Sequence, residues 1–301
     1  MNNWIKRVLY GHYYFKIIYD INPKWGADLI YKRFFNRKIN WENPKNLQEK
    51  TYWLLFNTNT EMWSRCADKY RVREYIKEKG AEEILTTLYG QWDDVDDIDF
   101  SALPDKFVLK ANNGCGSVIA ITDKSKLDVD AVKKKLKRWM KYPFGYNGSQ
   151  FHYLRIKPCI IAEQLLEEVG ETKILSPHSM VDYKIWCFNG EPESIIVVFD
   201  RAPGFTQQAL YDLEWNDLSP KVFKADYYKK PFPKPKNLDK MLDYARKLSK
   251  GFPEVRTDFY NIDGKIYFGE LTFTAGYGDL TDEYYDYLGS KVILPCEKQT
   301  K

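Results

Sequence analysis

The sequence has few residues of the kinds that build zinc centres or disulfide frameworks. It contains five cysteines and three histidines among 301 residues. No two cysteines stand at the C-x-x-C spacing of a zinc site, and their odd number argues against a disulfide framework. The histidines, His12, His152 and His178, are far apart along the chain. This composition predicts neither zinc chemistry nor disulfides, and it favours a reducing, cytoplasmic environment.

The sequence also lacks long hydrophobic runs. No apolar stretch approaches the roughly 18 residues that a membrane-spanning helix needs. The first residues show neither the apolar core nor the small-residue cleavage site of a secretory leader. Residues 4–19 are instead basic and aromatic. We favour a helix packed on its own domain, and the alternative is a peripheral contact with the inner face of the plasma membrane.

What the sequence does contain is typical of a globular protein that binds an anion. Hydrophobic residues make up 44% and charged residues 29% of the chain, which excludes a disordered protein. The net charge of +4 suits a nucleotide but is too small to indicate nucleic acid. Aromatic residues reach 16%, which fits either a sugar-binding surface or aromatic packing in the core and rim.

Hydrophobic periodicity and turn residues predict a chain of mixed helices and antiparallel strands. Asn189-Gly190 and Asp263-Gly264 predict two hairpin turns. The length predicts one large domain or two to three packed subdomains. The predicted strands are residues 106–110, 118–122, 159–162, 183–188, 194–199, 256–260 and 265–271, and the predicted helices include residues 68–79, 129–140 and 238–248.

Two carboxylates in the last predicted hairpin are candidates for a metal site. Asp258 and Glu270 lie on opposite strands, at comparable distances from the turn, so they should face one another. Such a pair is costly unless a cation lies between, and Mg²⁺ prefers oxygen ligands of this kind. Arg256 lies on the same strand face as Asp258 and could neutralise a transferring phosphoryl group. The alternative is a solvent-facing ladder of salt bridges.

A glycine-containing turn at residues 113–117 is a candidate phosphate site. It connects two predicted strands, so it is neither a Rossmann fingerprint nor a P-loop. Its backbone N–H groups could still form an anion-binding nest, with Lys110 reaching a phosphate. The alternative is an ordinary hairpin turn. Residues 162–166 follow another apolar strand, and their backbone could hydrogen-bond an adenine ring.

The order of these segments along residues 40–285 resembles the ATP-grasp superfamily, and more narrowly the TupA-like ATP-grasp family, which is found with genes for bacterial surface polysaccharides. The segments that carry the resemblance are Asn46-Leu47-Gln48-Glu49-Lys50-x-x-Trp53, Ala67-Asp68-Lys69-Tyr70-x-Val72-Arg73-Glu74-Tyr75, Phe107-Val108-Leu109-Lys110-x-Asn112-x-Gly114-x-Gly116, Asp182-Tyr183-Lys184, Phe188-Asn189-Gly190, and Arg256-x-Asp258 with Gly269-Glu270-Leu271-Thr272-Phe273.

The resemblance implies an α+β protein with the ATP-grasp fold, in which two α+β subdomains sandwich Mg-ATP behind an N-terminal helical extension. The implied parts are a helical extension at 1–66, a lid subdomain at 67–165 and a metal-binding subdomain at 166–301. The residues implied to contact ATP are Lys69, Lys110, Asn113, Gly114, Gly116, Ser117, Glu163, Gln164 and Leu165, with Glu168 or Asp182 at the ribose.

The resemblance also implies a metal set and catalytic cations. Asp258, Glu270 and Thr272 would hold Mg²⁺, with Arg256 near the γ-phosphate and Lys184 as a further phosphate contact. The wider superfamily carries Asn where this chain has Thr272. The TupA-like group itself carries Thr there, so we do not interpret the change as inactivation, but it leaves the number of metals open.

The function implied is an ATP-dependent carboxylate–amine ligase that works through an acyl phosphate. Its expected acceptor is a uronic acid of a bacterial surface polysaccharide or capsule, or of a lipid-linked precursor, and its expected donor is an amino acid or amine. Arg201 is a candidate clamp for a substrate carboxylate. Three alternatives are a glycan kinase, a non-catalytic binder, and a glycosyltransferase using the acidic run with Asp94 and Asp96 as its metal site.

Overall fold

The computed structural model describes residues 14–146, 148–225, 227–275 and 279–295. It divides into a first unit (residues up to Ile39, with Leu55–Arg73 and Thr86–Leu165) and a second unit (Asn40–Leu54, Glu74–Leu85 and Leu166 onward). His12, Tyr277, Cys296 and residues 4–13 of the basic aromatic segment lie outside the described residues. Within the described ranges, no helix has the length and apolar character needed to cross a membrane. The three-part division expected at 1–66, 67–165 and 166–301 stays a prediction.

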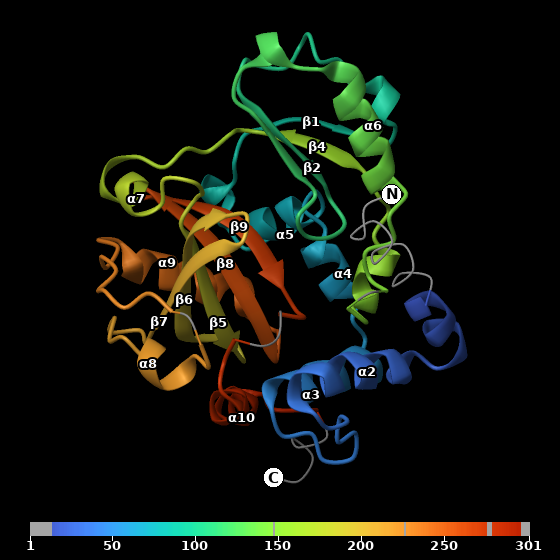
Figure 1. Ribbon diagram of the computed structural model, residues 1–301, viewed down its shortest axis with the longest axis vertical. Helices are drawn as coiled ribbons and strands as arrows, with labels where there is room; N and C mark the ends of the chain where they lie inside the picture. Colours follow the sequence, from blue (N-terminus) through green and yellow to red (C-terminus); the bar gives the residue numbers. More distant parts are fainter. Residues whose placement is uncertain (1–13, 147, 226, 276–278, 296–301) are drawn as a thin grey trace. The chain divides into compact units, whose positions relative to one another are not determined.

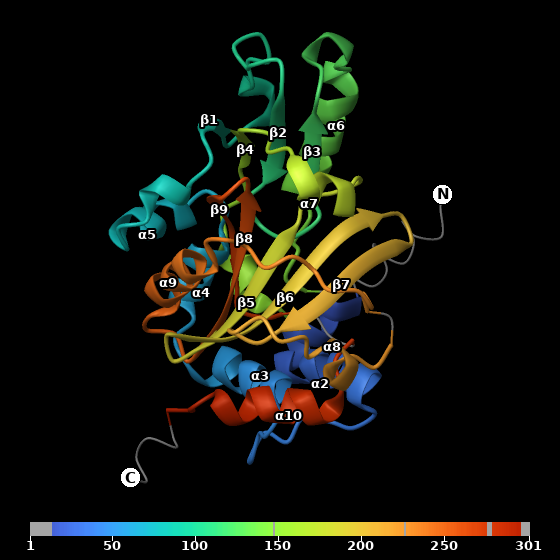
Figure 2. The same cartoon turned by 90° about the vertical axis from the view of Figure 1, so that its left-hand side faces the viewer.

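The first unit is built on a four-stranded antiparallel sheet with the order β1-β4-β2-β3. One long helix, α6, lies along this sheet, and Figures 1 and 2 show it beside the strands. The elements of this unit are β1 (Leu88–Trp92), β2 (Phe107–Ala111), β3 (Val118–Ile121), β4 (Ile160–Glu163), α2 (Pro23–Phe35), α4 (Glu61–Ala67) and α6 (Val129–Met140).

Alternation along β2 gives the first sheet two different faces. Phe107 and Leu109 are fully buried in a cluster with Leu136 of α6. Lys110 follows Leu109, so it belongs to the alternate set of positions on the strand, and it is only half-buried. Because side chains on a strand alternate between faces, Lys110 points away from α6, to the face that also carries Glu163 of β4.

The second unit is built on a five-stranded antiparallel sheet with the order β7-β6-β5-β8-β9. Helix α9 covers one face through β8, β5 and β6 (Figure 2). The elements are β5 (Asp182–Phe188), β6 (Glu191–Ala202), β7 (Phe205–Tyr211), β8 (Glu254–Ile262), β9 (Lys265–Thr272), α7 (Gly170–Leu175), α8 (Ser219–Val222), α9 (Leu238–Ser249) and α10 (Asp282–Lys291).

Both predicted hairpin turns are present. Asn189 and Gly190 have φ of 52° and 91°, and Asp263 and Gly264 have φ of 48° and 80°. Two consecutive residues with positive φ are typical of the two-residue turns whose twist matches a hairpin. The sheets and helices together confirm the α+β class.

Two further helices, α3 (Leu47–Asn57) and α5 (Val72–Glu78), contain residues at which the chain passes from one unit to the other. Glu49 and Asn46 cap α3 reciprocally, because the Glu49 N–H donates to Asn46 Oδ1 at 2.9 Å and the Asn46 N–H to Glu49 Oε2 at 3.4 Å. The first segment of the resemblance therefore has a local structural role.

The predicted start of the helix at residue 68 is wrong. The α-helix begins at Val72, because the Asp68 carboxylate accepts the N–H groups of Tyr70 and Arg71 at 2.9 and 3.1 Å. These bonds hold residues 68–71 in a turn. The structure also has strands that the sequence did not indicate, β1 with a central Gly90 and β7 with its polar Thr-Gln-Gln run.

Candidate nucleotide and metal sites

A buried carboxylate in the first unit accepts hydrogen bonds from two cationic side chains. Glu163, the last residue of β4, is 5% exposed. Its Oε2 accepts a hydrogen bond from Lys110 Nζ at 2.8 Å, and its Oε1 accepts from Arg73 at 2.9 Å and from the Thr86 hydroxyl at 3.1 Å. Buried charges are tolerated when they are paired in this way. Glu163 therefore fixes the direction of the Lys110 side chain.

The glycine turn and Lys69 lie against one another. The Lys69 N–H donates to the Asn112 carbonyl at 3.1 Å, and its ammonium donates to the Gly114 carbonyl. Gly114 and Gly116 have φ of 138° and 74°, a region that other residues rarely adopt. A Cβ on Gly114 would also come within 2.6 Å of the Phe144 ring. Glycine is required here by both backbone and space.

The turn carries little side-chain bulk toward solvent. A Cβ at Gly116 would meet no atom within 4 Å, so the space above it is open. Asn113 is buried, Ser117 is half-buried, and the Ala111 N–H closes the turn on the Ser117 carbonyl at 3.1 Å. A backbone with two positive-φ glycines and open space above one of them suits an anion.

The residues predicted for adenine and ribose follow β4. The Gln164 N–H donates to the Thr87 carbonyl at 2.9 Å, and Leu165 is half-buried. Glu168 lies in the second unit, where its carboxylate accepts the Val181 N–H at 2.7 Å and the Thr172 hydroxyl at 2.6 Å. Glu168 therefore holds the segment 168–181 together, and its role at a ribose stays a prediction.

In the second unit, the charged residues share the face of the sheet that lies opposite α9. Lys184 of β5 is the register partner of Asp258 of β8, and its ammonium donates to that carboxylate. Arg256 donates two hydrogen bonds to the Asp258 carboxylate, at 2.7 Å from Nε and 2.8 Å from Nη2. Asp182 accepts from Lys184 at 2.7 Å and from Arg201 at 3.0 Å. One connected ion-pair network results.

The predicted opposition of Asp258 and Glu270 is confirmed, since they are register partners between β8 and β9. A bulge follows at once, because the next pair is Phe259 with Phe268 and Gly269 is left over. A Cβ on Gly269 would lie 2.9 Å from the Asp258 carbonyl oxygen, so the bulge needs glycine. This glycine keeps the two acidic side chains side by side.

Thr272 joins the network through its hydroxyl. Arg256 Nη2 donates to Thr272 Oγ1 at 3.1 Å, and that hydroxyl donates to Glu270 Oε1 at 3.0 Å. Arg256 also lies 3.5 Å from Glu270 Oε1. The Glu270 side chain is 32% exposed while that of Asp258 is 3% exposed. Glu270 is therefore the member of the pair that reaches outward.

Burial and opposite charge compete at the centre of this network. Burial raises the pKa of Asp258 above its ordinary value, against the lowering effect of Arg256 and Lys184. Burial works to lower the pKa of Arg256, but Asp258, Glu270 and Asp182 outweigh it and raise that pKa. The guanidinium is therefore a permanent positive charge among three carboxylates.

Arg73 and Thr86 are site residues that the sequence did not assign. Their hydrogen bonds to Glu163 join positions 90 and 77 residues apart in sequence. Arg73 does lie inside the segment Ala67–Tyr75 of the resemblance, and this was the available signal.

The acidic run also has a structural explanation, because Asp96 pairs with Lys137 of α6 at 2.6 Å and the Asp94 carboxylate accepts the Asp96 N–H at 2.9 Å.

The sequence matches the profile of the TupA-like ATPgrasp family over residues 49–293, which is most of its length. The chain belongs to the TupA-like ATP-grasp family. It therefore has the ATP-grasp fold and is assigned to the ATP-dependent ligases that form carbon–nitrogen bonds. No curated protein matches this ATP-grasp chain.

Solved ATP-grasp structures resemble the chain at low sequence identity. D-alanine–D-alanine ligase from Bacillus anthracis, complexed with ATP, is 15% identical over 79% of this chain and 69% of its own, with a TM-score of 0.46. L-amino acid ligase from Bacillus licheniformis is 13% identical over 76% and 45%, with a TM-score of 0.44. D-alanine–D-alanine ligase from Helicobacter pylori is 15% identical over 82% and 66%, with a TM-score of 0.42.

The donor set of the second unit fits Mg²⁺. Asp258, Glu270 and Thr272 offer only oxygen atoms, which hard cations prefer. Among the described residues, no three His, Cys, Asp or Glu side chains are close enough to hold a metal by themselves. Mg²⁺ is usually held by one or two carboxylates together with substrate phosphates, so a pair with a hydroxyl is sufficient.

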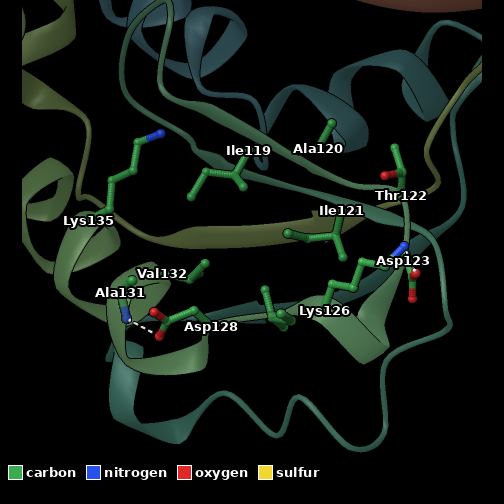
Figure 3. A pocket seen from close by; sticks show the side chains of 11 residues that line it. Ile119, Ala120, Ile121, Thr122, Asp123, Lys126, Asp128, Ala131, Val132 and Lys135 are labelled. Carbon is green, nitrogen blue, oxygen red and sulfur yellow. Dashed lines mark hydrogen bonds and ion pairs between the residues drawn. The ribbon is translucent and has the colours of Figure 1, made fainter.

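A cavity of about 390 Å³ lies elsewhere in the first unit, between β3 and the start of α6 (Figure 3). Its walls are Ile119, Ile121 and Val132, with Lys126 and Lys135 on its rim. None of the predicted site residues lines it, so we assign it no part in nucleotide binding.

Proposed function

We propose that this ATP-grasp enzyme joins an amine, such as that of an amino acid, to the carboxylate of a uronic acid in a bacterial surface polysaccharide or its lipid-linked precursor, in the cytoplasm. In the first step, a carboxylate oxygen of the acceptor takes the γ-phosphoryl group of ATP and ADP leaves. In the second step, the amine attacks the acyl carbon, phosphate leaves, and the amine loses a proton.

The cations of the first unit would bind the ATP phosphates. Lys110 and Lys69 both lie at the glycine turn or on the strand that leads into it, and Glu163 directs Lys110. Two cations, Arg73 and Lys110, pair with the single carboxylate Glu163. This positive excess supports phosphate binding because charge-assisted hydrogen bonds to phosphate are strong. The adenine would then contact the backbone of Gln164 and Leu165.

The second unit would hold the metal and the transferring phosphoryl group. Mg²⁺, bound by Asp258, Glu270 and Thr272, would offset phosphate charge during the transfer. Arg256 and Lys184 would stabilise the charge that develops on the phosphoryl oxygens. The observation that carries the proposal is the register pairing of Asp258 with Glu270, bridged by Arg256.

Arg201 is the candidate for the acceptor carboxylate. Its side chain is 44% exposed, and one guanidinium nitrogen lies 3.0 Å from the Asp182 carboxylate. A guanidinium that is anchored at one end and accessible at the other can grip a second carboxylate. The choice of a uronic acid rests on the family association with polysaccharide genes.

The test is nucleotide turnover by the purified protein with Mg-ATP, a panel of uronic acids and a panel of amino acids. A ligase produces ADP and free phosphate only when both substrates are present. A kinase would instead produce ADP with an acceptor alone and leave the phosphate on it. The absence of ATP binding in calorimetry, together with no turnover, would contradict the proposed function.

The control is the double variant Asp258→Asn/Glu270→Gln, which keeps the size of both side chains. The proposal requires its turnover to vanish while its secondary structure by circular dichroism is unchanged. Turnover at the wild-type rate in this variant would show a contaminating ATPase.

A further inference from the structure

Large apolar side chains are exposed in one part of the first unit, residues 14–21 and α2, drawn in dark blue in Figure 1. Six of the fourteen exposed large apolar residues found in the described chain lie between positions 14 and 34. Ile21 and Trp25 are 66% and 53% exposed. Single exposed apolar residues are common, but a concentration of this kind marks a contact surface. The six residues are Tyr14, Ile17, Ile21, Trp25, Leu29 and Phe34.

These helices are nevertheless packed on their own unit by their other faces. Ile18 is buried, and the Tyr19 ring lies 4.4 Å from that of Phe151. Ala27 and Tyr31 of α2 are fully buried. This is the packing that we favoured from the sequence. It fixes the helices and leaves a second, outward apolar face on each.

The spacing of the exposed residues confirms that each helix has such a face. In residues 14–21 they stand at Tyr14, Ile17 and Ile21, steps of three and four. In α2, Trp25 and Leu29 are four apart. Steps of three and four place side chains on the same side of a helix. We call these five residues the outer apolar face.

The same segment carries a concentration of positive charge. Residues 14–38 contain six basic residues and two acidic ones, a net charge of +4 that equals the net charge of the whole chain. Asp20 pairs with Lys16 at 2.7 Å, and Asp28 accepts the Ile39 N–H at 3.2 Å. The basic residues are Lys16, Lys24, Lys32, Arg33, Arg37 and Lys38.

We propose that the outer apolar face docks on an anionic lipid surface. Aromatic and aliphatic side chains together with Lys and Arg suit the boundary between lipid headgroups and acyl chains. Trp and Tyr are favoured at that boundary because one end of the ring is apolar and the other can hydrogen-bond. This inference goes beyond the proposed ligase reaction and needs none of its residues.

A second copy of the chain is a poorer occupant for this face. A symmetric dimer places the same patch of both subunits in contact. Here it would bring two surfaces of net charge +4 against one another, whereas an anionic bilayer offers the opposite charge.

The test is cosedimentation of the full-length protein with large vesicles of phosphatidylcholine and phosphatidylglycerol in equal parts, beside vesicles of phosphatidylcholine alone. We expect binding to the anionic vesicles that weakens when NaCl is raised from about 0.1 M to about 0.5 M. The variant Ile21→Ser/Trp25→Ser/Leu29→Ser should lose about tenfold or more in vesicle partitioning, because its apolar contact is removed. Thermal unfolding checks that this variant is folded.

A matched control removes three equally exposed apolar side chains from the second unit, as Ile174→Ser/Phe205→Ser/Ile293→Ser. It should bind vesicles like the wild type, and so should the conservative Trp25→Phe. The proposal is overturned if the wild type does not sediment with anionic vesicles. It is equally overturned if both triple variants bind alike, or if sedimentation velocity shows a dimer that only the Ile21 variant dissolves.

Discussion

The two ion clusters of the molecule differ in their balance of charge, although each is built from neighbouring antiparallel strands. In the first unit the single carboxylate Glu163 faces two cations, Lys110 and Arg73. In the second unit three carboxylates face three cations. The cluster of the second unit consists of Asp182, Asp258, Glu270, Lys184, Arg201 and Arg256.

Under the proposed function, this difference would divide the two halves of the chemistry between the clusters. A cluster with excess positive charge attracts phosphate oxygens and gains little from a metal. A balanced cluster keeps carboxylate oxygens at a fixed place without the repulsion that they would feel alone. It can accept a divalent cation together with the negative charge of a nucleotide. The first unit thus suits the anion and the second suits the cation.

The largest effect is expected from Asp258→Asn, which breaks the balance of the second unit. We expect ADP formation to fall by about 10³-fold, because Lys184 and Arg256 lose the charge they share and the metal loses a ligand. Initial rates at saturating ATP measure it. Asp243→Asn, which removes an exposed partner of Arg246 at 2.9 Å, is the control. A rate within about tenfold of the wild type for Asp258→Asn would contradict this role.

Lys110→Met should weaken ATP binding by about 10- to 100-fold, the usual size of a lost charge-assisted contact. Glu163 keeps Arg73 as its partner at 2.9 Å, so the strand should remain folded. Calorimetry with ATP measures the change, and Lys110→Arg should restore part of it. Lys126→Met, at an 82% exposed lysine of the same unit, should bind ATP normally. Equal affinity in the two Met variants would remove Lys110 from the site.

A smaller effect, on stability, is expected at Glu254. Its protonation state decides whether a fourth negative charge is present in the second unit. Burial raises its pKa to about 8, although Arg256 and Thr51 act to lower it. Oε2 faces the Thr51 hydroxyl at 3.4 Å, and Oε1 has no hydrogen-bond partner within the part of the chain described. Burial therefore favours the protonated, uncharged form of Glu254, which adds no fourth negative charge to the three carboxylates and three cations.

The consequence for stability follows from the sign of this shift. Between pH about 4.5 and 8 the folded protein keeps the proton that the unfolded chain releases, so the free energy of unfolding falls as pH rises through this window. Glu254→Gln should remove this dependence and stabilise the protein by about 3–4 kcal/mol more at pH 8 than at pH 5. Urea unfolding at both pH values measures it. A parallel pH dependence in wild type and variant would show that Glu254 ionises normally.

The smallest expected effect is protection of Cys115 in the glycine turn. This cysteine is exposed, whereas Cys66, Cys159 and Cys187 are buried, and burial raises the pKa of the latter two to about 12. Maleimide should therefore label Cys115 faster than these three. Mg-ATP bound at the turn should slow its labelling several-fold, as peptide mapping can measure. Unchanged labelling at saturating ATP would place the nucleotide elsewhere.

The hairpin that carries the second site could be predicted from sequence because the turn chemistry is local. Asp263-Gly264 requires positive φ, which fixes a two-residue turn and therefore which residues face one another. Continued without interruption, this register would pair Asp258 with Gly269, so the turn places Asp258 and Glu270 only roughly opposite one another. The bulge at Gly269 then makes Asp258 and Glu270 register partners. The bulge at Gly269 could not be predicted by alternation, since an extra residue interrupts the period of two.

Long-range pairings were beyond the sequence. Nothing local relates Glu163 to Arg73 of α5, or Asp182 to Arg201, because each pair is brought together only by the folded chain. The prediction that a helix begins at residue 68 was wrong because the Asp68 side chain competes for backbone N–H groups. It accepts the Tyr70 N–H and holds a turn, so the helix begins at Val72. Segments such as 40–54 and 74–85 join the second unit through tertiary contacts that periodicity does not encode.

The most direct test of this division compares ATP binding in Mg²⁺ with ATP binding in a chelator, by calorimetry, for the wild type, Lys110→Met and Glu270→Gln. Lys110→Met should weaken binding in both conditions, because its charge meets the phosphates whether or not metal is present. Glu270→Gln should weaken only the binding that depends on Mg²⁺. If Glu270→Gln weakens metal-free ATP as much as Lys110→Met does, the assignment of anion and cation to separate clusters is wrong.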